Sequence, residues 1–246
     1  MAAVACAGFG RLRSCHLRCA RLRSHVRRRR NPPAMRNPHP IAAIGVVLTL
    51  VSVRGAASAG PQAGAVLALY GQSFGETDGR RMPLGLGDPI YVAETLEVAA
   101  GAKLRLRMND GSIISIASGA RLTITDYRVG NGGESREAIL SLGEGLLRAV
   151  VSALKGSPHF EVDTATSVAA VRSTDWFIEA QQGSTQVGVL EGRVSLKSVA
   201  TGHEIVIPAH WGARVEAGRD PVPARIWTGA EFDDFIRRTS LDAAPP

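Results

Sequence analysis

Four polar residues, Arg172, Ser173, Thr174 and Asp175, separate two apolar runs in the segment VAAVRSTDWFI, residues 168–178. An arginine, two hydroxyls and a carboxylate this close together could form a catalytic site. A nucleophile or general base needs a partner that activates it, and the neighbouring sequence shows none. We therefore interpret the segment as a structural turn and predict that Arg172 and Asp175 form a charge-assisted ion pair between successive strands.

A second candidate is the sequence GQSFG, residues 71–75, which has the G-x-S-x-G pattern of the serine hydrolase nucleophile elbow. That motif requires a helix directly after the serine. Residues 76–88 instead read as a loop that contains glycine and proline. We interpret residues 71–75 as a hairpin turn between two strands.

The histidines that follow residue 60 are potential metal ligands: His159, His203 and His210. His203 and Glu204 together with His210 could begin a metal site, but no third ligand motif lies near them. Four acidic residues near glycine-rich turns also lack the spacing of a calcium loop: Asp110, Asp126, Glu134 and Glu137. We expect no metal, no cofactor and no catalytic residue, and hence no enzyme.

The charge of the chain is divided unevenly along its 246 residues, which together carry a net charge of +7. Residues 1–59 contain eleven arginines, no lysine and no acidic residue. Subtracting these eleven from the 29 basic residues leaves 18 against 22 acidic ones, a net charge of −4 from residue 60 onward. This part has no excess of cations to neutralise phosphates, so we expect no nucleic-acid partner.

Residues 35–59 have the pattern of a secretory signal peptide. Arg36 supplies a positive n-region, residues 41–53 an apolar h-region, and Ala57-Ser58-Ala59 a cleavage pattern. Cleavage before Gly60 would export the mature chain to the periplasm. The apolar run is shorter than the roughly 20 residues of a spanning helix. An uncleaved membrane anchor is the alternative, and it is the only membrane contact we expect.

Residues 1–34 are rich in arginine, cysteine and alanine and have neither helical nor strand periodicity. We interpret them as the product of a start codon placed too early or as a disordered basic extension. An RNA-binding tail and an unusually long n-region are the alternatives. All three cysteines lie in this segment, so the exported chain is expected to have neither a disulfide nor a thiolate metal ligand: Cys6, Cys15 and Cys19.

Short β-type segments fill residues 66–216, and each ends at glycine, Asn-Asp or proline. The clearest is KLRLRMNDGSIISI, where Leu104, Leu106 and Met108 share one face and the letters NDG indicate a turn. No segment shows the helical periodicity that a crossover helix needs. The pattern predicts an all-β domain of short strands, β-solenoid or β-roll-like, with a jelly-roll β-sandwich as the alternative.

Three parts follow the predicted signal peptide: an N-terminal strand and loop at 60–83, a β-domain at 84–216, and a Pro-rich link, short helix and tail at 217–246. The helix begins with a capping box between Thr228 and Glu231. Its apolar residues fall on one side: Phe232, Phe235 and Ile236. We expect this helix to pack over an open end of the β-domain as a structural cap. A docking peptide for a partner is the alternative.

Residues 159–198 resemble the core of the FecR domain, whose pattern runs F-x-V-x-T-P-x-A, V-R-G-T-D-F and V-x-V-x-E-G-x-V-x-V. The three motifs occur here in order, and the matching residues are Phe160, Val162, Thr164, Val171, Arg172, Thr174, Asp175, Val189, Glu191, Gly192, Val194 and Leu196. Residues 86–124 resemble the N-terminal half of the family. The resemblance covers roughly residues 84–215 and implies that Arg172–Trp176, Glu191 and Gly192 have structural roles.

Several positions depart from the family pattern: Ala165 stands in place of proline, Ser173 in place of glycine, and Trp176 in place of phenylalanine. If the family glycine has a positive φ, Ser173 implies a turn strained by about 1 kcal/mol. The best-known members regulate sigma factors for iron-siderophore uptake through a cytoplasmic helical segment, a membrane helix and a periplasmic FecR domain. Residues 1–40 are too short and too rich in arginine for that helical segment, so we do not expect anti-sigma activity.

The resemblance implies a non-enzymatic periplasmic module for protein interaction or signal sensing, with an envelope or periplasmic protein as its partner. Such a module could add a partner's strand to a free sheet edge. The alternative is a domain that binds carbohydrate or another envelope polymer by stacking on Trp176, Trp211 and Trp227. Three buried rings would favour the first function, and two rings exposed on one concave face would favour the second.

Overall fold

Alternating apolar and polar residues form the clearest hairpin of the structure, between β6 (Lys103–Met108) and β7 (Ile113–Ile116). Leu104, Leu106 and Met108 are buried on one side of β6, as a period of two residues requires. Asn109, Asp110 and Gly111 form the connecting turn, so this predicted turn is confirmed.

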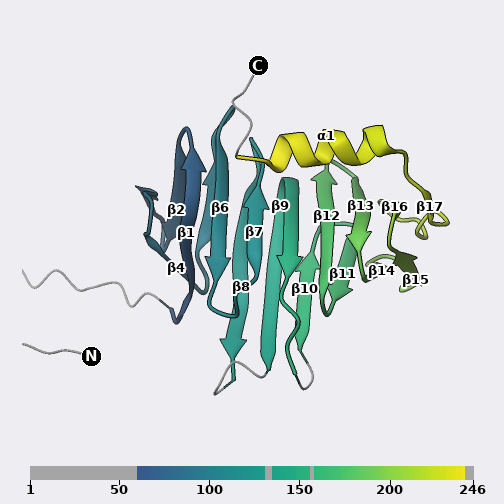
Figure 1. The fold of residues 1–246 in the computed structure, drawn as a ribbon, viewed down its shortest axis with the longest axis horizontal. Helices are drawn as coiled ribbons and strands as arrows, with labels where there is room; N and C mark the ends of the chain where they lie inside the picture. The colour runs from purple at the N-terminus through teal and green to yellow at the C-terminus, as the bar shows by residue number, and fades with distance from the viewer. Residues whose placement is uncertain (1–59, 131–134, 156–157, 242–246) are drawn as a thin grey trace, which may run out of the picture. The chain divides into compact units, whose positions relative to one another are not determined.

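Figure 1 shows the computed structural model, which describes residues 60–130, 135–155 and 158–241. The predicted basic extension (1–34), the signal peptide (35–59) and Glu134 lie outside the described residues. Within the described part, no helix is long and apolar enough to cross a membrane.

Seventeen strands form two ladders that share strand β9. Ladder A contains, in pairing order, β4 (Pro89–Tyr91), β1 (Gln62–Tyr70), β6, β7, β9 (Arg136–Val151), β12 (Thr174–Gln181), β13 (Ser184–Glu191), β16 (Trp211–Glu216) and β17 (Arg225–Ile226). Ladder B contains β3 (Arg80–Pro83), β2 (Ser73–Thr77), β5 (Thr95–Val98), β8 (Arg121–Val129), β9, β10 (His159–Asp163), β11 (Ser167–Val171), β14 (Arg193–Ser198) and β15 (Glu204–Pro208).

The two ladders face each other across one apolar core. Side chains from both contribute to it, among them Leu122 and Phe160 from ladder B and Trp176 and Val187 from ladder A. Strand β9 pairs with β8 before Gly145 and with β7 and β12 after it, so it passes from one ladder to the other. After β9 the chain places hairpins alternately in ladder B and ladder A.

The all-β class with a short C-terminal helix is confirmed, and the sheet does not close on itself. The β-solenoid or β-roll type is not confirmed. Stacked coils would pair their strands in parallel, whereas β9–β10 is the one parallel pair among the described strands and the others are antiparallel.

Helix α1 (Gly229–Thr239) has the predicted capping box. The Thr228 hydroxyl accepts a hydrogen bond from the Glu231 N–H at 3.3 Å, and the Glu231 carboxylate accepts one from the Thr228 N–H at 2.8 Å. The Lys103 ammonium donates to the Arg237 and Ser240 carbonyls at the other end, at 2.9 and 2.6 Å. These carbonyls are negative, so the cation stabilises the helix end.

The helix packs on the outer face of ladder A, where it contacts Leu146 of β9 and Phe177 of β12, and not on an open end between the ladders. Trp176 and Ile178 point into the core, so Phe177 between them points outward. Phe177 contacts Phe235 of the helix with ring centroids 5.5 Å apart. The position of the helix therefore differs from the expected one because β12 is apolar on both faces.

Candidate functional site

The polar cluster that opened the sequence lies where the chain passes from ladder B to ladder A. β11 ends at Val171 and β12 begins at Thr174, so Arg172 and Ser173 form the connection, which we call the corner. Both corner residues are exposed, and Thr174 is buried. The Thr174 hydroxyl donates to the Arg193 carbonyl at 3.3 Å and thereby joins the corner to β14.

The predicted ion pair between Arg172 and Asp175 is wrong. Asp175 accepts two hydrogen bonds from Arg148 of β9, from Nε at 2.9 Å and from Nη2 at 2.7 Å. The chain changes ladders at the corner, so Arg172 lies on the outer face of ladder B and Asp175 on that of ladder A. The hydrogen bonds from Arg148 to Asp175 raise the pKa of Arg148 and keep it charged.

A buried arginine that we did not predict from the sequence, Arg136, is hydrogen-bonded to the backbone of the corner. The Arg136 side chain is 0% exposed and donates to the Asp110 carboxylate and, at 3.3 Å, to the Ser112 hydroxyl and the Ser152 carbonyl. Its second nitrogen, Nη2, donates to the Arg172 carbonyl at 3.0 Å. One guanidinium therefore joins the β6–β7 turn, the end of β9 and the corner.

Asp110 is the buried counter-charge of Arg136. Its side chain is also 0% exposed. The Tyr127 hydroxyl donates to its Oδ1 at 3.0 Å and accepts the backbone N–H of Asp110 at 2.8 Å. Burial alone would raise the pKa of Asp110, but hydrogen bonds from Arg136 and Ser112 lower it below its ordinary value. Burial, followed by the charge of Asp110, raises the pKa of Tyr127. Asp110, which we predicted to be an ordinary loop residue, is therefore part of a buried ion pair.

The sequence did contain a signal for Arg136. On β9, Arg136, Ala138, Leu140 and Leu142 alternate with less buried residues and so share the inward face. A charged residue in phase with a buried apolar series needs a buried partner, because an unpaired charge there costs several kcal/mol. Finding that partner required the fold, since Asp110 lies 26 positions earlier.

Gly192, the glycine of the third FecR motif, packs directly on the corner. It has a φ of 86°, and a Cβ built on it would lie 2.7 Å from the Ser173 carbonyl oxygen. Ser173 is not among the described residues with positive φ, so the strain that we considered for the Gly-to-Ser departure does not arise. Glu191, beside Gly192, is exposed and lies opposite Asp175 in the β12–β13 pair.

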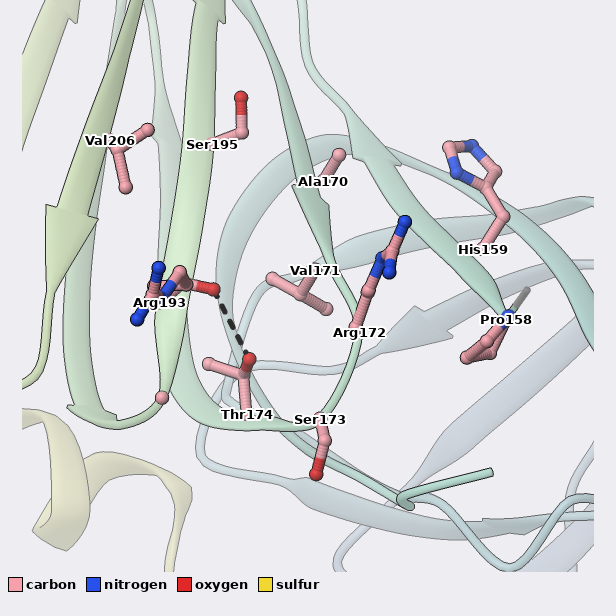
Figure 2. A pocket seen from close by; sticks show the side chains of 11 residues that line it. Pro158, His159, Ala170, Val171, Arg172, Ser173, Thr174, Arg193, Ser195 and Val206 are labelled. Carbon is pink, nitrogen blue, oxygen red and sulfur yellow. Dashed lines mark hydrogen bonds between the residues drawn. The ribbon is translucent and has the colours of Figure 1, made fainter. Parts of the chain in front are cut away.

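The corner forms one end of a groove of about 620 Å³ on the outer face of ladder B (Figure 2). Strands β10, β11, β14 and β15 line it through His159, Ala170, Ser195 and Val206 respectively, and Arg172 and Arg193 lie at the corner end. Val171, Arg172 and Thr174 of the second FecR motif and Gly192 of the third therefore meet at the corner end of an open groove.

The other candidate residues do not gather into a site. His159 lies in the groove with Nε2 3.2 Å from the Glu161 carboxylate, whereas His203 precedes β15 and His210 follows it. Ser73 is 1% exposed and begins β2; since β1 and β2 belong to different ladders, residues 71–72 connect the ladders and do not form the expected hairpin. The described residues contain no group of three potential ligands that could hold a metal.

The tryptophans do not form an exposed stacking surface. Trp176 is 0% and Trp227 is 5% exposed, and Trp211 is half-buried against the core. Trp227 lies flat on Gly188 and Gly212, where any Cβ would enter the ring. These positions do not provide the two exposed rings on one concave face that the carbohydrate hypothesis requires.

Comparison with known proteins supports the assignment of the FecR motifs. Residues 94–195 match the family model described as FecR protein. Two crystal structures of a protein from Parabacteroides distasonis ATCC 8503, provisionally assigned as an anti-sigma factor, are similar at 15% identity and a TM-score of 0.47. The match covers 58% of this chain and 64% and 63% of those chains, less than two thirds of their length. No match was found among curated proteins.

The matched residues include the corner, Gly192 and most of the groove wall. The FecR resemblance found in the sequence is therefore confirmed over residues 94–195.

Proposed function

We propose that this chain is an exported, non-enzymatic regulatory module of the FecR type, which binds an envelope or periplasmic protein and has no anti-sigma segment. The single observation that carries the proposal is that residues of two FecR motifs form one end of an open groove beside a free strand edge. Strand β15 lines the groove and pairs only with β14 among the described strands, so its other edge is available for main-chain hydrogen bonds.

The polar groups of the groove are suited to binding and poorly suited to catalysis. The Ser195 hydroxyl donates to the Glu204 carboxylate, and His159 contacts Glu161. Ser195 and His159 lie on strands separated by β11, about 9.5 Å apart at the usual strand spacing. A serine nucleophile needs its base within hydrogen-bond reach, so this pair does not form a hydrolytic site.

Export is supported by the signal-peptide pattern of residues 35–59 and by the charge change at residue 60. The test is fractionation of the host cells, followed by N-terminal sequencing and intact mass of the recovered protein. We expect a periplasmic chain that begins at Gly60. Recovery from the cytosol or the membrane with residues 1–34 still present would overturn the proposal.

A further inference from the structure

Three basic side chains line the corner end of the groove: His159, Arg172 and Arg193. Pairing places Phe160 opposite Val171 and Ala170 opposite Ser195. One position further along the first register and two positions further along the second, the strands place His159 of β10, Arg172 after β11 and Arg193 of β14 in one row at the corner end of the groove (Figure 2). Neighbouring strands lie about 4.8 Å apart, so a single extended ligand can reach these side chains together.

The two arginines have no counter-charge. Among the described residues, neither the Arg172 nor the Arg193 guanidinium has an ion-pair or hydrogen-bond partner, and both side chains are exposed. Elsewhere on ladder B the exposed arginines Arg81 and Arg121 pair with the Glu97 carboxylate. Like charges on adjacent strands repel each other, so the arrangement costs some stability and favours the binding of an anion.

Beside these charges the groove has a floor of small side chains. Ala170 and Ser195 occupy the two central strands, and the longer His159 and Val206 occupy the strands on either side. Val206 is 57% exposed, although it is apolar. The concavity therefore results from side-chain size, and it offers a place for an apolar side chain beside two arginines.

We propose that this groove binds an extended, carboxylate-rich segment of a partner protein. Its carboxylates would pair with Arg172 and Arg193, and an apolar side chain would lie over Ala170 and against Val206. A peptide fits better than an anionic polysaccharide, because Ala170 and Val206 offer apolar contacts and only a peptide backbone can also pair with the free edge of β15. The inference rests on the proposed function and specifies the class of partner.

The test uses the protein purified from its host in the form that the cells contain. The probe is a fluorescein-labelled ten-residue peptide of alternating Glu and Val. Two matched peptides carry Gln or Lys at every Glu position, and binding is followed by fluorescence anisotropy. The variant Arg172→Glu/Arg193→Glu reverses both groove charges. Its control, Arg80→Glu/Arg107→Glu, makes the same charge change at two exposed arginines outside the groove.

We expect the Glu peptide to bind at least about tenfold more tightly than the Gln peptide. The groove variant should weaken binding of the Glu peptide at least about tenfold and bind the Lys peptide instead, while the control keeps the native preference. Ala170→Trp fills the floor without changing the charge and should also weaken binding. Circular dichroism confirms that each variant is folded.

Equal weakening by the groove variant and its control would overturn the inference, and so would equal binding of the Glu and Gln peptides. Tighter binding of polygalacturonate with the same dependence on Arg172 and Arg193 would overturn the peptide assignment in favour of an anionic polysaccharide. The two proposals fail separately. If the protein is periplasmic but does not bind the Glu peptide, only the inference of an acidic partner segment is refuted. If the chain is retained in the cytosol, the proposed function is refuted.

Discussion

At the scale of single residues, the groove depends on a side chain that does not line it. The Arg136 guanidinium donates to the Arg172 carbonyl and so holds the backbone of the corner on which the exposed Arg172 side chain stands. The same guanidinium neutralises the buried Asp110 carboxylate. Breaking a buried ion pair by removing one partner is more costly than removing an exposed charge, because the remaining charge is left unpaired.

We predict that Arg136→Met lowers the free energy of unfolding by about 3 to 5 kcal/mol, measured by urea denaturation. Arg193→Met is the matched control, because it removes an exposed arginine and should change stability by no more than about 0.5 kcal/mol. The double variant Asp110→Asn/Arg136→Met should recover part of the loss, since it leaves no buried charge. An Arg136→Met protein as stable as the native one would contradict this account.

A second residue-scale prediction concerns the close approach of Gly192 to the corner. Gly192→Ala should destabilise the fold by about 2 to 3 kcal/mol, because the new Cβ meets the Ser173 carbonyl and φ is positive. Gly183→Ala is the control: it has a similar φ of 76° but no atom within 4 Å of the added Cβ, and it should cost about 1 kcal/mol. Equal losses in thermal unfolding would show that contact with the corner is unimportant.

At the scale of elements, helix α1 is fixed at both ends by polar contacts and along its length by aromatic rings. Trp227 contacts Phe232 and Phe235, with ring centroids 5.3 Å apart in each pair. Arg225 donates to Glu231 at 2.5 Å, and Glu231 closes the capping box. The first turn of the helix therefore depends on the charge of one carboxylate.

That dependence predicts a response to pH. Hydrogen bonds from Arg225 and from the Thr228 backbone lower the pKa of Glu231 to about 2, from an ordinary value of 4.5. A lowered pKa gives stability that is complete above about pH 4.5 and is lost as the pH falls toward 2. The difference in Tm between the native protein and Glu231→Gln, followed by Trp227 fluorescence, should therefore be present at pH 6 and vanish near pH 2. A difference in Tm between the two proteins that stays the same from pH 6 to pH 2 would contradict this role of the Glu231 charge.

The sequence was sufficient to predict individual strands and the helix, but not the contacts that their residues make with other elements. Alternation was enough for β6, and the capping box was enough for the start of α1, because both signals are local. The ion pair of Asp175 could not be predicted, because Arg148 becomes its neighbour only when β9 and β12 pair in ladder A. The groove was likewise hidden, because His159, Arg172 and Arg193 meet only after three strands of ladder B are in register.

At the scale of the whole molecule, the chain places its FecR motifs at the point where it passes between two facing ladders. Ladder A carries the helix on its outer face, and ladder B leaves its outer face open at the groove. The two faces therefore differ in their capacity for binding. At the groove end of ladder B, unpaired arginines, small floor side chains and a free strand edge are available together to a partner protein.

The most direct test of this account is photo-crosslinking inside the host cells, with p-benzoylphenylalanine at Val206 in the groove. Met82 on β3, at the opposite edge of ladder B, is an equally apolar and exposed control position, 64% exposed against 57% for Val206. We predict that Val206 forms an adduct with an envelope or periplasmic protein, that Arg172→Glu/Arg193→Glu abolishes it, and that Met82 does not form it. No adduct at Val206, or the same adduct from both positions, would contradict the account.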